Sequence, residues 1–231
     1  MRISVINSVS QEDEAASEAF RQLASATDQF ERYANPHADR IAAIADEIAK
    51  LFHMAPQDRR SLRTAALIHD LGEVAMERDY IQRAGALTAE ERIDLARHPV
   101  IGEQEAARAG ADRAAQLLVR WHHEWWNGCG YPDALRRDQI PLAARILRLA
   151  DTYAALTDAR PFRPALTEAE ARQEIVRWAA IEFDPRIVNV LLSLEASEDL
   201  RSFATREVTL ETHNPEVQRD TNSLPGRVNV R

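Results

Sequence analysis

His-His-Glu-Trp-Trp-Asn-Gly-Cys-Gly-Tyr-Pro, residues 122–132, places two adjacent imidazoles and a carboxylate directly before a loop with two glycines. Apolar residues upstream recur at helical spacing, so a helix is expected to end at or near His122 and His123. Gly128 then favours a loop. Neighbouring helical side chains point about 100° apart, so the two rings cannot easily bind one ion but can each bind one of two adjacent ions. The stretch therefore predicts a two-metal centre, provided that further ligands come from elsewhere.

Candidates for those further ligands lie in several predicted helices. His69-Asp70 follows an apolar helical run, and this pair could place an imidazole on one metal and a carboxylate between two. Taken alone, the dipeptide is more typical of a polar helix end. Asp151 lies among apolar helical residues, where a carboxylate is costly to bury unless it is paired or bound to metal. His37 and His98 complete the set, each at the expected start of a helix.

The order and spacing of these motifs resemble the HD-GYP family over most of the chain. The matching residues are His69-Asp70, His98-Pro99 with Gly102, His122-His123-Glu124, Gly128, Gly130-Tyr131-Pro132, Asp151, Ala155-Leu156-Thr157, Arg160-Pro161 and Arg163. Members of this family are all-helical, metal-dependent phosphodiesterases that linearise or fully hydrolyse the bacterial second messenger cyclic di-GMP. The resemblance therefore implies an all-α HD-domain helical bundle with a metal centre, which converts cyclic di-GMP to linear pGpG, to GMP, or to both.

The resemblance also implies roles for individual residues. Asp70 is expected to bridge two metal ions and act as the catalytic carboxylate, within the ligand set His37, His69, Asp70, His98, His122, His123 and Asp151. Two divalent ions, iron or manganese in characterised relatives, would share a hydroxide that attacks phosphorus. Arg160 and Arg163 match positions that hold the substrate phosphates. Tyr131 either stacks on a guanine or belongs to a surface that contacts diguanylate cyclase (GGDEF) domains.

Three positions depart from the family pattern. Glu73 stands where the family usually carries a lysine that is thought to contact phosphate or assist proton transfer, and a glutamate there would repel phosphate. Asn127 replaces an aspartate but keeps an acceptor. Tyr33 replaces a glutamate of the relatives that bind three metals, so two metals are expected. Because of Glu73, the alternative is a catalytically weak or inactive adaptor that binds cyclic di-GMP and retains the metal site. A di-iron oxygenase is a further alternative, disfavoured by the Gly-Tyr-Pro loop.

Composition favours a helical protein of the cytoplasm. Only seven glycines among 231 residues favour helices over a turn-rich β architecture. A net charge of −8 argues against a nucleic-acid polymer as partner, so phosphate must be met by local positive charge. The single cysteine, Cys129, excludes an intrachain disulfide and suits a reducing compartment. Neither a signal peptide nor a membrane-spanning stretch is evident, so we expect a cytoplasmic protein without membrane contact.

Three segments are expected along the chain. Residues 1–34 form an N-terminal segment with a lead helix that could serve as a homodimer contact, residues 35–200 form the helical HD-GYP-like domain, and residues 201–231 form a C-terminal extension. Residues 2–9 and the stretch around Val208 and Leu210 partly alternate, so two short terminal strands could pair. Beyond the second strand the polar extension is expected to be disordered.

Capping signals locate several helix ends. Thr88 with Glu91, and Thr167 with Glu170, form the capping-box pattern that opens a helix. Gly72, just after His69-Asp70, is expected to stop the preceding helix. These local signals predict helices whose ends carry several of the candidate ligands.

Overall fold

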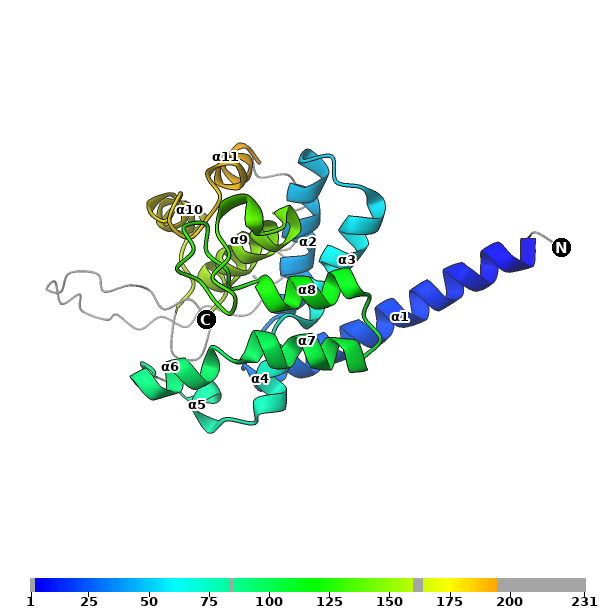
Figure 1. Ribbon diagram of the computed structural model, residues 1–231, viewed down its shortest axis with the longest axis horizontal. Helices are drawn as coiled ribbons and strands as arrows, with labels where there is room; N and C mark the ends of the chain where they lie inside the picture. Colours follow the sequence, from blue (N-terminus) through cyan, green and yellow to red (C-terminus); the bar gives the residue numbers. More distant parts are fainter. Residues whose placement is uncertain (1–2, 84, 160–163, 195–231) are drawn as a thin grey trace, which may run out of the picture.

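The computed structural model describes residues 3–83, 85–159 and 164–194, and the named elements in this part of the chain are all helices (Figure 1). In chain order they are α1 (Ile3–Phe30), α2 (His37–Leu51), α3 (Pro56–Ile68), α4 (Leu71–Met76), α5 (Asp79–Gln82), α6 (Ala89–Leu95), α7 (His98–Arg108), α8 (Arg113–Trp121), the 3-10 helix η1 (Arg137–Gln139), α9 (Leu142–Thr157), α10 (Glu168–Arg177) and α11 (Pro185–Ser193). The expected all-α fold is confirmed. None of these helices has the length and apolar character that a bilayer crossing requires.

Helix α9 lies at the centre of the hydrophobic core. It packs against α2, α3, α8 and α10, and Ile146, Leu147 and Leu149 on its different sides are fully buried. A helix that is apolar nearly all round belongs in the interior, so the polar residues that it carries are buried with it. Two of these are Arg148 and Asp151. Helix α9 therefore brings charge into the middle of the bundle.

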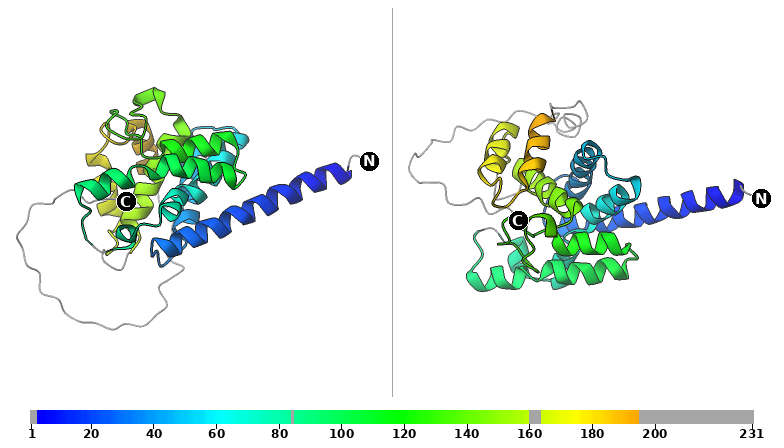
Figure 2. Two further views of the ribbon diagram at one scale, coloured as in Figure 1. Left: turned by 60° about the horizontal axis from the view of Figure 1, so that its bottom comes forward. Right: turned by 45° about the horizontal axis from the view of Figure 1, so that its top comes forward.

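Helix α1 packs on the bundle with its C-terminal half only. Phe20 and Ala24 are buried, and the helix contacts α2, α3 and α4. Its N-terminal half projects away from the other helices (Figures 1 and 2). The strand expected at residues 2–9 is wrong, because Ile3 already begins this helix. A short alternating stretch needs a partner strand to form a sheet, whereas here it continues a helix that is anchored on the core.

The second strand, expected around Val208 and Leu210, lies outside the described residues, as does the rest of the segment 201–231. The division into segments 1–34, 35–200 and 201–231 stays a prediction. Both capping boxes are confirmed: Thr88 caps α6 together with Glu91, and Thr167 caps α10 together with Glu170.

Gly72 does not end a helix but lies inside α4, which corrects the expectation from sequence. A Cβ atom at this position would collide with the carbonyl oxygen of His98, so glycine is required for the close approach of α4 to α7. This glycine reflects contact with a distant segment rather than a local turn. This contact brings the start of α7 next to Asp70.

Candidate metal centre

The seven residues expected as ligands come from different helices and all lie in the interior. His37 opens α2, His98 opens α7, and Asp151 lies within α9. The other four lie at helix ends: His69 and Asp70 between α3 and α4, and His122 and His123 directly after α8. Each of the seven is at most 7% exposed. Placement at helix ends allows their rings to converge without any backbone crossing the site.

The ligand atoms form two groups, within each of which all atoms lie less than 4.8 Å apart. The four-residue group contains Asp70, His98, His122 and His123, and the three-residue group contains His37, His69 and Asp151. Asp70 reaches both groups. Its Oδ2 lies 3.1 Å from His69 Nε2, and its Oδ1 lies 3.2 Å from His98 Nε2 and 3.4 Å from His122 Nε2. A carboxylate in this position can bridge two ions.

The donor set fits divalent metal ions. His69 Nε2 and Asp70 Oδ1 are buried, yet they find no hydrogen-bond partner in the described part of the chain. Unsatisfied polar atoms in the interior are costly, and a bound cation removes that cost. Imidazole nitrogens mixed with carboxylate oxygens suit iron, manganese and zinc. The two groups could therefore hold metal ions.

Backbone contacts fix the orientation of three imidazoles. Nδ1 of His69, His98 and His122 each donates a hydrogen bond to the carbonyl oxygen three residues earlier, at 2.9, 2.8 and 2.6 Å. With the proton on Nδ1, the lone pair of a neutral ring is on Nε2, the atom that faces Asp70. Such contacts behind a ligand usually fix its tautomer and raise its basicity.

His37 is held by a carboxylate instead. Its Nδ1 donates to Asp158 Oδ2 at 2.7 Å, and Asp158 also accepts from Arg40, whose Nη2 donates to Thr157 Oγ1 at 2.7 Å. Burial raises the pKa of Asp158, but the bonds from His37 and Arg40 outweigh it and hold this pKa below its ordinary value. Burial lowers the pKa of His37. Tyr33 stacks on the His37 ring, with centroids 3.7 Å apart and planes inclined by 13°.

His123 has a different neighbour. Nδ1 of His123 lies 3.2 Å from Arg148 Nη1, which also donates to Asp151 Oδ2 at 3.1 Å. Arg148 Nε donates to Glu182 Oε1 at 2.9 Å, and the side chains of Arg148 and Glu182 are 6% and 9% exposed. Burial holds the pKa of His123 well below its ordinary value, and the charge of Arg148 lowers it further. His123 is therefore neutral beside a buried guanidinium.

Asp70 has the opposite effect on its neighbours. Burial lowers the pKa of His69, but the Asp70 carboxylate raises it to about 10. Burial also lowers the pKa of His98, but the close contact with the Asp70 carboxylate raises it above its ordinary value. The same contacts outweigh burial on Asp70 and keep its pKa well below the usual range. Without metal, the Asp70 carboxylate thus favours protonation of His69 and His98, whereas burial keeps the pKa of His122 below its ordinary value.

The loop after the paired histidines is tied down at both ends. Glu124 accepts a hydrogen bond from the backbone N–H of Asp133 at 2.6 Å. A Cβ at Gly130 would lie 2.5 Å from the His123 carbonyl oxygen, so only glycine allows this close approach of the loop. The same carbonyl oxygen accepts a hydrogen bond from the N–H of Tyr131 at 3.2 Å. The Tyr131 ring therefore stacks on His123, with centroids 4.8 Å apart and planes inclined by 20°. It forms one wall of the four-residue group.

The other expected site residues have different outcomes. Arg160 and Arg163 lie outside the described residues. Glu73 is 4% exposed, and its charge contributes to raising the pKa values of His98 and Tyr131, so it acts on the site. The Asn127 side chain accepts the N–H of Cys129 at 2.8 Å and shapes the loop.

Sequence reasoning missed the charged pairs behind the ligands, Arg40 with Asp158 and Arg148 with Glu182. Arg148 carried a signal, because it interrupts the apolar run from residue 146 to residue 150. Asp158 follows Asp151 by seven residues, which is two helical turns and thus the same face. For Arg40 and Glu182 the sequence offers no comparable signal.

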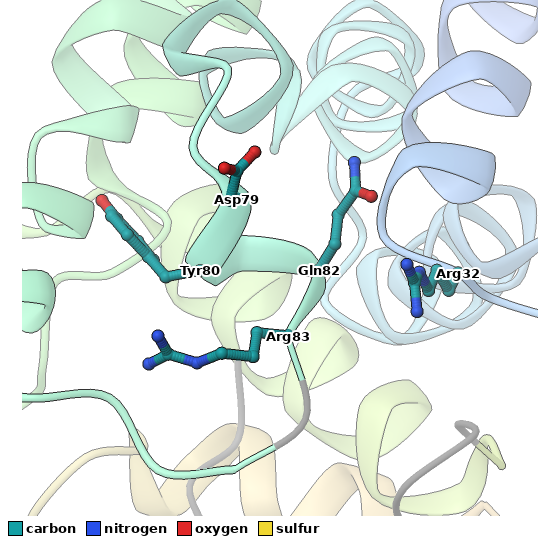
Figure 3. A pocket seen from close by; sticks show the side chains of 5 residues that line it. All are labelled: Arg32, Asp79, Tyr80, Gln82 and Arg83. Atoms are coloured by element: carbon teal, nitrogen blue, oxygen red, sulfur yellow. The ribbon is translucent and has the colours of Figure 1, made fainter.

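A surface hollow of about 490 Å³ lies elsewhere, lined by Arg32, Asp79, Tyr80, Gln82 and Arg83 (Figure 3). Two of these side chains are already engaged: Arg83 pairs with Glu91 at 2.9 Å, and Tyr80 donates to Asp94 at 2.8 Å. None of the seven expected ligands lines it. The hollow is therefore separate from the buried cluster of expected ligands.

Together, five imidazoles and two carboxylates inside a helical bundle define a protein with a candidate metal centre. The chain belongs to the HD domain family, whose model matches residues 15–187. The family is metal-dependent, and the HD-GYP resemblance seen in the motifs is confirmed.

Individual relatives agree with this assignment. The chain is 32% identical over 191 residues to the cyclic di-GMP phosphodiesterase response regulator RpfG of Xanthomonas campestris pv. campestris, covering 81% of this chain and 50% of that protein. It is 29% identical over 181 residues to the 3'3'-cGAMP-specific phosphodiesterase 2 of Vibrio cholerae serotype O1, covering 78% and 35%. Its fold is similar to that of Bd1817, an HDG"Y"P protein from Bdellovibrio bacteriovorus, with a TM-score of 0.56, 21% identity and coverage of 68% and 50%. The chain thus spans half the length of these relatives, or less.

Proposed function

We propose that this chain is a metal-dependent phosphodiesterase that hydrolyses cyclic di-GMP to linear pGpG, to GMP, or to both. The observation that carries this proposal is the convergence of seven buried ligand side chains in two groups, with Asp70 in contact with both. Relatives named as phosphodiesterases of cyclic di-GMP and of 3'3'-cGAMP support the substrate class.

The roles follow from the geometry. The three-residue group would hold one divalent ion and the four-residue group the other, with Asp70 shared between them. When bound, two such ions supply an activated water and positive charge for the phosphate oxygens. Asp70, as an anion, orients the imidazoles around it, and burial of all seven residues excludes bulk water. No nucleophile from the protein is required.

The number and kind of metals are part of the proposal. Tyr33 places an aromatic ring against His37, at the position where relatives with three metals carry a glutamate. This supports two ions rather than three. The nitrogen and oxygen donors suit iron or manganese. Arg160 and Arg163 remain the proposed phosphate-binding residues, on the strength of their family positions.

The test is turnover by protein of known metal content. Purified protein loaded with manganese or iron is analysed for metal and incubated separately with cyclic di-GMP and 3'3'-cGAMP, and the products are separated by chromatography. We expect two ions per chain and linear product from cyclic di-GMP in preference to 3'3'-cGAMP. If the protein binds two ions but forms no product from either substrate, the proposed phosphodiesterase activity is refuted. Oxygen consumption with an organic substrate would indicate the di-iron oxygenase instead.

A binding adaptor is the second candidate, and Glu73 is the observation that favours it. This buried carboxylate adds negative charge beside His98 and Tyr131, where a substrate phosphate would approach. An adaptor would bind cyclic di-GMP in equilibrium dialysis and leave it intact. Contacts with GGDEF domains through the Gly-Tyr-Pro loop, a homodimer through α1, and a cytoplasmic location without nucleic-acid partners also stay predictions.

A further inference from the structure

The position of one proton distinguishes His123 from the other four histidines of the centre. His69, His98 and His122 donate from Nδ1 to carbonyl oxygens, and His37 donates from Nδ1 to Asp158. Nδ1 of His123 faces Arg148 Nη1 at 3.2 Å. A guanidinium can only donate, so this nitrogen has to accept. A neutral imidazole that accepts at Nδ1 carries its proton on Nε2.

Arg148 is fixed in this position from behind. Its Nε and Nη2 both donate to Glu182 Oε1, and the pair is buried. The backbone carbonyl of Glu182 accepts the N–H of Trp126 at 3.0 Å, which ties it to the loop that follows His123. Withdrawing the guanidinium would leave a buried carboxylate unpaired, which is costly. Arg148 is therefore a built-in part of the site.

Arg148 has opposite effects on the two groups of expected ligands. Asp151 accepts Arg148 on Oδ2, which leaves Oδ1 directed at Nε2 of His37 and of His69, 3.9 Å from each. This contact orients a ligand of the three-residue group. For His123 to bind a metal ion through Nε2, its proton has to move to Nδ1, where it would face the N–H of Arg148. The contact with Arg148 therefore disfavours metal binding by His123 in the four-residue group.

We propose that Arg148 is a positioning residue that makes the two metal groups unequal: it orients Asp151 in the three-residue group and withholds His123 from the four-residue group. The inference rests on the proposed metal centre. It follows that the three-residue group binds its ion more tightly. The four-residue group starts with Asp70, His98 and His122, and gains His123 only when the guanidinium turns away.

The first test needs neither metal nor turnover, so its failure is distinct from failure of the proposed function. Metal-free protein labelled with ¹⁵N-histidine is examined by long-range ¹H–¹⁵N correlation, with His123 and His122 assigned from His→Gln variants. We expect His123 to carry its proton on Nε2 and the neighbouring His122 to carry it on Nδ1. A proton on Nδ1 of His123 would overturn the proposal.

The second test removes the guanidinium together with its partner. In Arg148→Met/Glu182→Met the guanidinium and Glu182 are removed together, so Glu182 is not left unpaired and Asp151 loses only its contact with Arg148. Manganese binding is followed by calorimetric titration. The wild type should show two affinities, and in the variant their ratio should shrink by about tenfold. An unchanged or larger ratio would overturn the proposal. If the variant does not fold, the tautomer of His123 measured in the wild type decides whether the proposal holds.

A matched control comes from the same helix. Arg145 lies one turn before Arg148, its side chain is 9% exposed, and it donates to Asp184 Oδ2 at 2.6 Å. Asp184 also accepts from Arg186 at 2.8 Å, so it keeps a cationic partner when Arg145 is replaced. Arg145→Met should retain the two affinities of the wild type. A change as large as in the double variant would show that loss of any buried arginine of α9 is sufficient.

Discussion

His37 and His123 lie at opposite ends of the same centre and are supported by the same residue types in reverse order. Behind His37, the carboxylate of Asp158 contacts the ring and Arg40 holds the carboxylate. Behind His123, the guanidinium of Arg148 contacts the ring and Glu182 holds the guanidinium. An acid in contact draws the ring proton to Nδ1 and frees Nε2, whereas a guanidinium in contact draws a lone pair to Nδ1.

The type of a metal-binding side chain alone therefore does not determine how strongly it binds. Both rings are buried, and burial lowers the pKa of both. Each support is a pair of opposite charges, so neither adds net charge to the interior. What differs is the group in direct contact with the ring. Experiments that remove one support, or the residue in contact with both groups, would change or abolish this difference.

The largest effect should come from Asp70, because it contacts both groups. Asp70→Asn keeps the shape but removes the negative charge that holds His69 and His98 at 3.1 and 3.2 Å. Turnover of cyclic di-GMP should fall by about 10²–10³-fold or more, since the stabilisation of charge at the reacting phosphate depends on the metals. Metal content should fall at both groups, which removes the difference between the two ends.

The matched control is Asp138→Asn, which neutralises a carboxylate whose side chain is 77% exposed and lies outside the centre. It should retain metal content and turnover. Full activity of the Asp70 variant with two bound ions would show that the carboxylate is not shared between the groups.

A smaller effect, confined to one end, is expected from Asp158→Ala. The variant removes the acceptor behind His37, so the ring loses the bond that orients its Nε2. Affinity of the three-residue group should drop by about 10–100-fold, while the four-residue group stays unchanged. Manganese titration resolves the two affinities. Equal weakening of both groups would mean that the two ends are not supported independently.

The other end is examined through Glu73. Glu73→Lys replaces a buried negative charge near His98 and Tyr131 by a positive one, which should attract the substrate phosphate. We expect turnover to rise by about tenfold, equivalent to roughly 1.4 kcal/mol of barrier. Glu90→Lys, on the exposed side of α6, makes the same change in net charge and should have no effect. A gain of equal size in both variants would indicate attraction by the overall charge instead.

Much of this centre could be predicted because its signals are local. Helical periodicity and motif spacing pointed to seven side chains that the structure brings together in two groups, and the capping boxes predicted the starts of α6 and α10. The pairing of the supporting residues could not be predicted, because Arg40 meets Asp158 across 118 residues and Arg148 meets Glu182 across 34. Gly72 shows the same limit, since its neighbour is the backbone of α7 rather than the next turn.

The smallest expected effect concerns pH and separates His69, whose pKa is raised, from the neutral His123. In metal-free protein the pKa of His69 is about 10, against roughly 6.5 in an unfolded chain. Its pairing with Asp70 is then fully stabilising below about pH 6.5 and is lost as pH rises toward 10. The melting temperature with chelator present should therefore be a few degrees higher at pH 6 than at pH 9, at roughly 2–4 °C per kcal/mol.

His69→Gln should remove this part of the pH dependence of the melting temperature. The trend should reverse with metal, because metal binding strengthens as protons leave the ligands. A metal-free protein with the same melting temperature at both pH values would show that His69 is neutral like His123, and that only the tautomers distinguish the two ends.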